Sequence, residues 1–505
     1  MNRDDIDILI IGSGLGGLVC GAILSREGYK VCILEKNKQI GGCLQTFVRD
    51  KIIFDSGVHY IGGLSKGQNL YQIFKYLNIL DKLKLQQMNV DAFDKILFEN
   101  DEHEYPMAQG YDNFIKQLLV YFPDEEKAIR AYCDKIKEVC NKFPFYNLRS
   151  GEDANEKNET LSLNAKAFIE SLTNNKKLQE VLAGSNALYA GIPDKSPFYV
   201  HALVLNSYIE SSWKCMDGGS QIGKYLGRVI RDNGGEIIRN CTVTQLVEVD
   251  GKISYAELED GTKMHAKNFI SNIHPAKTLE MTKSDVIRNV YRKRITTLEN
   301  TISSFTLNVV LKKNTYKYIK TNYYYHTENS VWYGWNYSED NWPMGYALFF
   351  SASSKSEEYA ESVTILTYMR YEDVKLWEGT FNTVSLKNNR GETYDEFKKN
   401  KAEKLLDLVE KRFTGLKDAI QTYYTATPLS YRDYIGNDDG SLYGILKNNN
   451  DPMKSLISSK TKIPNLYLTG QNMILHGILG VSISALVTCG AFMDMDTLIE
   501  KVRNA

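Results

Sequence analysis

The first residues of the chain alternate between short apolar runs and a helical spacing of apolar positions. "DILIIG" (7–12) is a β-branched run closed by glycine, which predicts a buried strand. "GLVCGAILSREGY" (17–29) has the apolar spacing of a helix, and "KVCILE" (30–35) predicts a second strand. Together these segments predict a βαβ unit at the start of the chain.

The pattern changes from about residue 90 to residue 210, where helical spacing dominates. The clearest example is "DEEKAIRAYCDKIKEVCNKF" (124–143), which predicts one long helix. The polar stretch "RSGEDANEKNET" (149–160) has no apolar periodicity, so we expect an exposed loop there.

Alternation of helices and strands returns after residue 217. The pattern predicts a helix, a strand at 236–238, a β-meander at 242–258 and a strand at 269–273. Two Asp-Gly pairs, at 250–251 and 260–261, are typical of hairpin turns.

The last strand–helix pair contains the segment whose environment matters most. "NLYLTG" (465–470) predicts a strand, and the segment from Met473 to Met493 carries no formally charged residue. That segment is long enough to span a bilayer, which is one interpretation. Because it also contains Gly477, Gly480 and Gly490, we expect a helix buried inside the protein instead.

A chain of 505 residues is too long for one hydrophobic core, so we expect two domains. The segments with strand–helix alternation predict one nucleotide-binding domain assembled from separated pieces. The predicted boundaries are 1–90, 211–290 and 456–505 for this domain, and 91–210 with 291–455 for an inserted substrate-binding domain.

Composition narrows the classes of function. Apolar residues make up 43% and charged residues 24%, which is ordinary for a soluble globular protein. A net charge of -1 provides no basic field, so we expect no nucleic-acid partner. The eight cysteines form no CxxC pair and no metal-ligand spacing, so we predict reduced thiols and no metal site. No signal-peptide pattern is visible, and we expect a cytoplasmic protein.

The glycines after the first strand predict a phosphate-binding turn. Gly12, Gly14 and Gly17 form G-x-G-x-x-G, and Gly16 lies within the motif. The first glycine permits the tight turn, the second clears space for a pyrophosphate, and the third lets helix and strand pack closely. The helix that follows adds positive potential at its N-terminus. A glycine-rich turn without any ligand is the alternative interpretation.

Glu35 ends the second predicted strand, about 20 residues after the turn, where a carboxylate accepts hydrogen bonds from ribose hydroxyls. Lys36 follows it and is included among the predicted cofactor contacts. A carboxylate would repel a 2′-phosphate, so NADP fits this site poorly.

A second glycine pair follows the acidic residue. Gly41, Gly42 and Thr46 fit G-G-x-x-x-T. FAD is longer than the first βαβ unit, and a second glycine pair lets the main chain approach such a cofactor again. The pattern therefore favours FAD over NAD.

At this point the sequence resembles a known family. The segments that carry the resemblance are "GGCLQT" (41–46), "FDSGVHYIGG" (54–63), "CMDGGSQIGKYLGRVIRDNGGEIIRNCTVTQL" (215–246), "ATPLSYRDYIGNDDGSLYG" (426–444) and "NLYLTGQNMILHGILGVSISALVTCG" (465–490). They are similar to the retinol saturase and carotenoid isomerase branch of the phytoene desaturase-like FAD-dependent oxidoreductases. This resemblance implies an α/β fold, with a discontinuous FAD-binding Rossmann-like domain and an inserted α+β substrate domain.

The resemblance also implies roles for particular residues. The backbone of Val243 would meet the adenine, Gly470 would end the last strand, and Gly480 with Val481 would open a helix aimed at the flavin. Gln471 stands where many members of the wider superfamily have an acid that binds the ribityl chain, so carry-over from amine oxidases is weakened there. The remaining implied contacts to the ADP part are Gly12, Gly14, Gly17, Glu35 and Gly42.

Family members act on long isoprenoid or conjugated lipids, and bound flavin exchanges hydride with them. The 33 Tyr and 19 Phe would suit a flat apolar tunnel, although core packing accounts for most of them. His59 is the leading candidate for a proton donor, and a structural role near the cofactor is the alternative. The same alternative applies to His476.

The resemblance leaves several functions open. The first is a saturase or desaturase acting on C=C bonds, and the second is a polyene cis-trans isomerase. The third is an escort protein that carries prenylated partners without a flavin, although such a protein would not need the complete glycine motif. Electrons would come from external NAD(P)H or from another protein, and a lipid substrate implies peripheral contact with a membrane surface.

Overall fold

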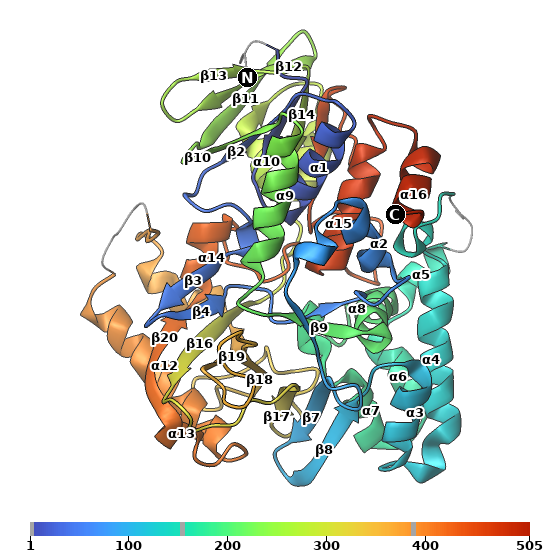
Figure 1. Cartoon of the computed structure of the whole chain (residues 1–505), viewed down its shortest axis with the longest axis vertical. Helices are drawn as coiled ribbons and strands as arrows, with labels where there is room; N and C mark the ends of the chain where they lie inside the picture. The colour runs from blue at the N-terminus through green and yellow to red at the C-terminus, as the bar shows by residue number, and fades with distance from the viewer. Residues whose placement is uncertain (1–4, 152–156, 385–389) are drawn as a thin grey trace.

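The computed structural model describes residues 5–151, 157–384 and 390–505. Its central sheet has five parallel strands in the order β10-β2-β1-β14-β21 (Figure 1). The strands are β1 (Ile8–Ile11), β2 (Val31–Glu35), β10 (Glu236–Arg239), β14 (Asn268–Ser271) and β21 (Leu466–Leu468). Three distant parts of the chain therefore build one sheet, and the predicted α/β fold with a discontinuous Rossmann-like domain is confirmed.

The first strand is apolar at every position because both of its faces are buried. Ile8 and Ile10 pack into a core shared with the helices, whereas Leu9 and Ile11 pack into a second core shared with the β-meander. This alternation follows from the two-residue period of a strand. The pattern "ILII" thus places the sheet between two covering layers.

Three helices cover one face: α1 (Leu15–Arg26) packs against both α9 (Ser220–Asp232) and α15 (Gly477–Cys489). The Cys20 thiol of α1 lies 3.7 Å from the carbonyl oxygen of Ala485 in α15. The uncharged segment is therefore a buried helix, as predicted, and it lies against the opening helix (Figure 1). Among the described helices, none has both the length and the apolar character needed to cross a membrane.

The other face carries a four-stranded sheet in the order β13-β12-β11-β15. Asp250 and Gly251, with φ of 53° and 81°, form the turn between β11 and β12, which confirms the first predicted hairpin. The strands are β11 (Val243–Val249), β12 (Lys252–Leu258), β13 (Lys263–His265) and β15 (Thr282–Lys283); the nearby helices are α10 (Pro275–Met281) and α11 (Asn289–Thr296).

A second large sheet has seven strands in the order β20-β16-β19-β18-β17-β7-β8, in which only the β17–β7 pair is parallel. Its strands are β7 (Asp94–Phe98), β8 (Asp101–Met107), β16 (Ser303–Leu311), β17 (Asn322–His326), β18 (Gly345–Phe350), β19 (Ser362–Met369) and β20 (Ile420–Ala426). Tyr323 and Tyr325 face α12 (Glu392–Glu410), whereas Tyr324 faces the opposite core. Residues 91–210 and 291–455 both contribute strands, and the exact domain boundaries remain predictions.

A helical layer packs beside this sheet, at the lower right of Figure 1. The predicted helix at 124–143 is confirmed as α4 (Glu126–Asn141), with Cys133 and Cys140 buried on one face. The predicted loop at 149–160 is wrong at its end, because α5 (Lys157–Ser162) begins there and packs against α8; residues 152–156 lie outside the described part. The other helices of this layer are α3 (Tyr111–Leu119), α6 (Ala165–Leu172), α7 (Lys176–Ala183) and α8 (Phe198–Glu210).

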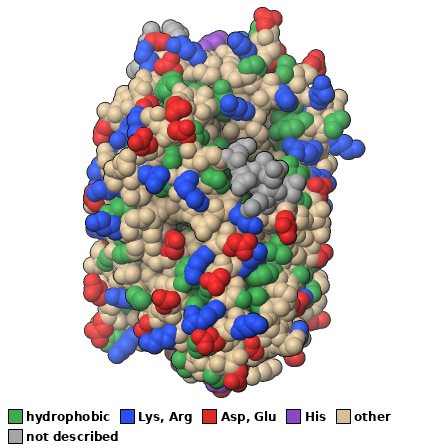
Figure 2. Space-filling view, turned by 90° about the vertical axis from the view of Figure 1, so that its right-hand side faces the viewer, with side chains coloured by type: hydrophobic (Ala, Val, Ile, Leu, Met, Phe, Trp, Pro, Cys, Tyr) green, Lys and Arg blue, Asp and Glu red, His purple; other side chains and the backbone are tan. Residues whose placement is uncertain are grey.

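Short strands connect these parts around the centre of the molecule. A hairpin joins β3 (Thr46–Arg49) to β4 (Ile52–Asp55), and β9 (Ser212–Cys215) lies between β5 (Ile61–Gly62) and β6 (Leu85–Gln87). The remaining helices are α2 (Asn69–Tyr76), α13 (Leu416–Ala419), α14 (Pro428–Ile435) and α16 (Met495–Arg503). Seven of the eight cysteines are buried, and Cys43 is partly buried. Basic and acidic side chains are interspersed on the face shown in Figure 2.

Candidate functional site

The first glycine turn is shaped by backbone contacts between β1 and α1. Gly12 follows β1 with φ of 91°, a conformation that favours glycine. A Cβ atom on Gly17 would lie 2.2 Å from the carbonyl oxygen of Gly12. The third glycine of the motif is therefore required for helix and strand to approach each other, as predicted for that position.

Asn272, directly after β14, lies beneath this turn and was missed by the sequence analysis. Its Nδ2 donates to the carbonyl oxygen of Gly12 at 3.3 Å. A Cβ atom on Gly14 would lie 2.8 Å from that nitrogen, and one on Gly16 would lie 2.5 Å from Oδ1. The available signal was its place at the carboxyl end of a parallel strand, where ligands of such sheets bind.

Glu35 is 5% exposed and is already a structural acceptor. It accepts hydrogen bonds from the backbone N–H of Ser13 at 3.0 Å, the hydroxyl of Ser13 at 2.5 Å and the N–H of Asn37 at 2.8 Å. A carboxylate has about four acceptor positions, so capacity remains for a ribose hydroxyl. Next to it, burial lowers the pKa of Lys36, whose Nζ donates to the carbonyl oxygen of Asp433 at 3.2 Å.

The second glycine pair packs on the first turn. The N–H of Gly41 donates to the carbonyl oxygen of Ser13 at 3.0 Å, and a Cβ atom on Gly42 would lie 3.1 Å from Cα of Gly14. Both glycines have positive φ, 114° and 57°. Because these glycines lack side chains, the two backbone segments can meet. The same lack of side chains would let a cofactor approach the backbone.

A cavity of about 330 Å³ runs from this double turn toward the centre of the protein. The predicted contact residues that line it are Gly12, Gly14, Gly16, Glu35, Lys36, Gly41, Gly42, His59, Val243, Gly470, Gln471 and Val481.

Three predicted contact residues lie elsewhere. Gly17 packs beneath the turn, and the Thr46 hydroxyl bonds to the hydroxyl of Ser220 at 3.0 Å, away from the cavity lining. Gly480 lines a second, neighbouring cavity instead. The helix start at Gly480–Val481 implied by the resemblance is also wrong, because α15 begins at Gly477; the glycine there, with φ of 75°, turns the chain into the helix three residues earlier.

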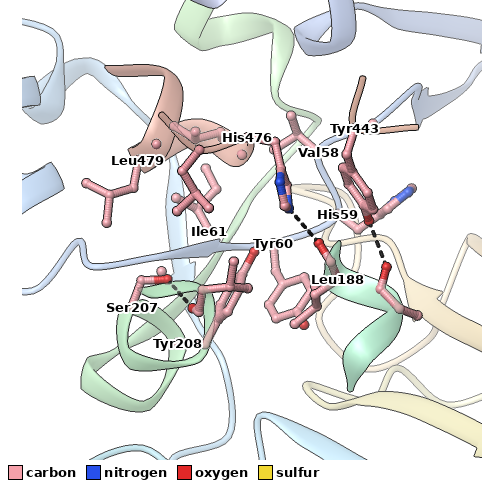
Figure 3. A pocket seen from close by; sticks show the side chains of 18 of the residues that line it. Val58, His59, Tyr60, Ile61, Leu188, Ser207, Tyr208, Tyr443, His476 and Leu479 are labelled. Carbon is pink, nitrogen blue, oxygen red and sulfur yellow. Dashed lines mark hydrogen bonds between the residues drawn. The ribbon is translucent and has the colours of Figure 1, made fainter. Parts of the chain in front are cut away.

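The second cavity has a volume of about 140 Å³ and a predominantly apolar wall (Figure 3). Figure 3 shows the segment Val58–Ile61 crossing it, with His476 and Leu479 on one side and Ser207 and Tyr208 of α8 on the other. The residues that line both cavities are Gly57, Val58, His59, Leu366, Tyr443, Gly477 and Ile478. The two spaces therefore share a wall at the N-terminus of α15.

His59 lines both cavities and His476 lines the second one, and both imidazoles are neutral at pH 7. His59 stacks on Phe349 with ring centroids 4.4 Å apart, and burial together with Lys214 lowers its pKa to about 4. His476 contacts the carbonyl oxygen of Leu188 through Nε2 at 2.9 Å, and burial lowers its pKa to about 4. The stacking supports a structural role for His59; proton donation by it stays a prediction.

Comparisons with known proteins were consistent with this geometry. Residues 10–77 match the family model of an NAD(P)-binding Rossmann-like domain. The chain is 26% identical to an all-trans-retinol 13,14-reductase of Danio rerio, covering 97% of this chain and 86% of that protein. It is 25% identical to a chloroplastic prolycopene isomerase of an Oncidium hybrid, covering 99% and 85%.

Among solved structures, an oxidoreductase from Methanosarcina mazei superposes with a TM-score of 0.63 at 15% identity, covering 95% of this chain and 99% of that one. This likeness concerns the fold. The sequence relatives confirm the resemblance drawn from the motifs: over nearly its whole length the chain is similar to all-trans-retinol 13,14-reductases and prolycopene isomerases.

Proposed function

We propose that the protein is an FAD-dependent oxidoreductase acting on C=C bonds of a polyene, a retinoid or a related isoprenoid lipid. One observation carries this proposal: a long cavity beginning at a dinucleotide-type glycine turn shares a wall with an apolar cavity at the N-terminus of α15. Relatives named as retinol reductases and prolycopene isomerases support the choice of substrate class.

The residues present fit FAD. Gly14, Gly16 and Gly42 line the cavity without side chains, and the buried carboxylate of Glu35 keeps acceptor capacity. The cavity continues past the second glycine pair to Gln471 and Val481, which a nucleotide limited to the first βαβ unit would not need. An escort protein without a flavin would need none of these features.

The chain's own residues would hold the cofactor and the lipid in place. The N-terminus of α15, at Gly477, would stabilise negative charge on a reduced flavin ring. Apolar side chains such as Val58, Ile61 and Leu479 would exclude water from the reacting carbons. Bound flavin supplies the hydride acceptor or donor in such chemistry.

The proposal predicts that purified protein binds FAD, and that one class of polyene reoxidises the flavin after anaerobic photoreduction. Absorbance of the flavin measures the reaction, with retinoids, carotenoids and other unsaturated lipids as the panel. Protein that carries no flavin, or a flavin that no lipid reoxidises or reduces, would contradict the proposal.

The second candidate function is a polyene cis-trans isomerase, and the relatives named prolycopene isomerases favour it. Product mass separates the two functions. A change of two hydrogens indicates a redox reaction, whereas an unchanged mass with altered double-bond geometry indicates isomerisation.

We also propose that NAD(P)H acts as an external electron donor. A 2′-phosphate does not suit the glycine-turn site itself, because Glu35 lies there. Reduction of the bound flavin by NADH or NADPH, followed by absorbance, distinguishes this source from a partner protein.

Finally, we propose peripheral contact with a membrane through the segment 376–384. Leu376 is 82% exposed, Val384 63% and Phe381 38%, an unusual density of exposed apolar side chains. The protein should float with liposomes in a density gradient, and replacing these three residues by serine should leave it in the aqueous fraction. Wild-type protein that remains entirely aqueous would contradict the proposal.

A further inference from the structure

A chain of hydrogen-bonded hydroxyl groups leads from a buried acid to the wall of the apolar cavity. The Tyr60 hydroxyl lies 2.8 Å from Oδ2 of Asp94 and 2.8 Å from the hydroxyl of Tyr324. Both tyrosines line the cavity, whereas Asp94, at the start of β7, is completely buried behind them. The Tyr60 ring is held by stacking on Tyr208 at 4.3 Å (Figure 3).

Asn322 gives Asp94 a partner in either protonation state. Its Nδ2 donates to Oδ1 of Asp94 at 2.9 Å, and among the described residues its own Oδ1 is buried without a hydrogen-bond partner. Oδ1 of Asp94 can accept this hydrogen bond both when Asp94 is ionised and when a proton lies on Oδ2, on the side of Tyr60.

The groups around Asp94 allow its protonation state to change near neutral pH. Burial raises the pKa of Asp94 to about 7, opposed by hydrogen bonds from Tyr60 and Asn322 and by the charge of Lys214. Burial likewise raises the pKa of Asp55 to about 7 and lowers that of Lys214 to about 7. The charge of Lys214 lowers the pKa of both carboxyl groups, and both carboxyl groups raise the pKa of Lys214.

Lys214 is fixed in β9, where its Nζ donates to the carbonyl oxygen of Phe350 at 2.7 Å. Asp55 accepts a hydrogen bond from the N–H of Gly219 at 2.7 Å. Tyr208 also lies near Asp94, and its hydroxyl stays protonated because burial and the charge of Asp94 raise its pKa. The cluster supplies both an acid and a countercharge next to the cavity.

We propose that Asp94, Tyr60 and Tyr324 form a proton relay to the lipid carbon that does not receive the hydride; this inference rests on the proposed function. In reduction of a C=C bond, bound reduced flavin would supply a hydride, which carries the electron pair, to one carbon. The neighbouring carbon then takes the proton of the Tyr324 hydroxyl, so that one O–H bond breaks and one C–H bond forms.

The phenolate left on Tyr324 takes the proton of Tyr60, and Tyr60 takes that of Asp94. Asp94 ends as a carboxylate, so one proton and one hydride have been added to the lipid. The hydrogen-bond directions agree with this order. With Asp94 ionised, Tyr60 donates to it and Tyr324 donates to Tyr60; with Asp94 protonated, both bonds reverse and the Tyr324 proton is free for the cavity.

The test compares Tyr324→Phe and Asp94→Asn with the control Tyr323→Phe. Tyr323 belongs to the same strand but faces α12. Reoxidation of photoreduced flavin by the active polyene should slow about 10²–10⁴-fold in both relay variants, the usual contribution of a positioned acid, and should be unchanged in the control. Flavin content and the urea unfolding midpoint should match those of the control.

The pH dependence of the reoxidation rate separates a proton relay from a purely structural role of Asp94, because a structural role would not change that dependence. The wild-type rate should fall as the pH rises through about 7, because the relay needs a proton on Asp94, and Asp94→Asn should abolish this dependence. Infrared titration of protein without lipid should show carboxyl C=O bands that disappear near pH 7. One should be missing in Asp94→Asn and the other in Asp55→Asn.

The outcomes separate the two proposals. If no polyene reoxidises the wild-type flavin, the proposed function fails, and the infrared titration still reports whether Asp94 carries a proton. If the wild type turns over but Tyr324→Phe reacts equally fast, or if Asp94→Asn retains the carboxyl bands of the wild type, the relay is overturned.

Discussion

Replacing Gly17 by alanine should lower the free energy of unfolding by about 3 kcal/mol or more, and the purified protein should carry no FAD. The added Cβ would lie 2.2 Å from the carbonyl oxygen of Gly12, a backbone atom that cannot rotate away. Helix α1 must therefore move from β1, which deforms the turn predicted to hold the pyrophosphate. Urea unfolding followed by circular dichroism measures the first effect, and flavin absorbance after purification measures the second.

Gly379→Ala is the matched control, since a Cβ there would meet no atom within 4 Å. Its free energy of unfolding should change by less than about 0.5 kcal/mol, and its flavin content should equal that of the wild type. A Gly17→Ala protein as stable and as yellow as this control would show that the turn tolerates a wider separation of strand and helix.

Replacing His201 by phenylalanine should remove part of the protein's sensitivity to acid. The buried ring of His201 lies in α8 between the hydroxyls of Tyr132, 2.7 Å from Nε2, and Tyr189, 3.0 Å from Nδ1. Burial lowers its pKa from 6.5 to about 3. Between these values the unfolded chain binds a proton that the folded protein excludes, so stability is full above pH 6.5 and is lost as the pH falls.

From pH 7 to pH 5 this one group should cost the wild type on the order of 2 kcal/mol, a loss that His201→Phe would not share. The difference in unfolding free energy between the two proteins should therefore shrink by that amount over this range. His265→Gln, at an exposed position of β13, serves as the control and should follow the wild type at both pH values. An unchanged difference would mean that His201 accepts a proton without unfolding.

The parts of the fold that sequence predicts best are those whose reasons are local. The unit from β1 to β2 is specified by a continuous apolar run, glycines at fixed offsets and a terminal acid, all within 30 neighbouring residues or so. The helix at Lys157 was missed because its sequence is polar; contact with α8, about forty residues away, supports it. Such tertiary support leaves no periodicity in the segment itself.

The candidate site shows the same division. Eleven of the predicted cofactor residues line one cavity because motif offsets fix them relative to the strands; they are Gly12, Gly14, Gly16, Glu35, Lys36, Gly41, Gly42, Val243, Gly470, Gln471 and Val481. Asn272 was not predicted as a site residue, because a single asparagine after a strand belongs to no recognisable motif. The sequence also showed no sign of the group Tyr60, Asp94 and Tyr324. Asp94 and Tyr324 come together only because β7 pairs in parallel with β17.

The parallel sheet takes its last strand and one covering helix from a late part of the chain, which affects folding during synthesis. Its edge strand β21 and the helix α15 that covers α1 come from the last forty residues of the chain. On a ribosome, β14 lacks one strand neighbour and α1 lacks its packing partner α15 until residues 466–489 have been synthesised. Until then, growing chains expose one edge of β14 and one face of α1, and a stop codon placed before residue 466 should yield chains that chaperones retain and proteases remove.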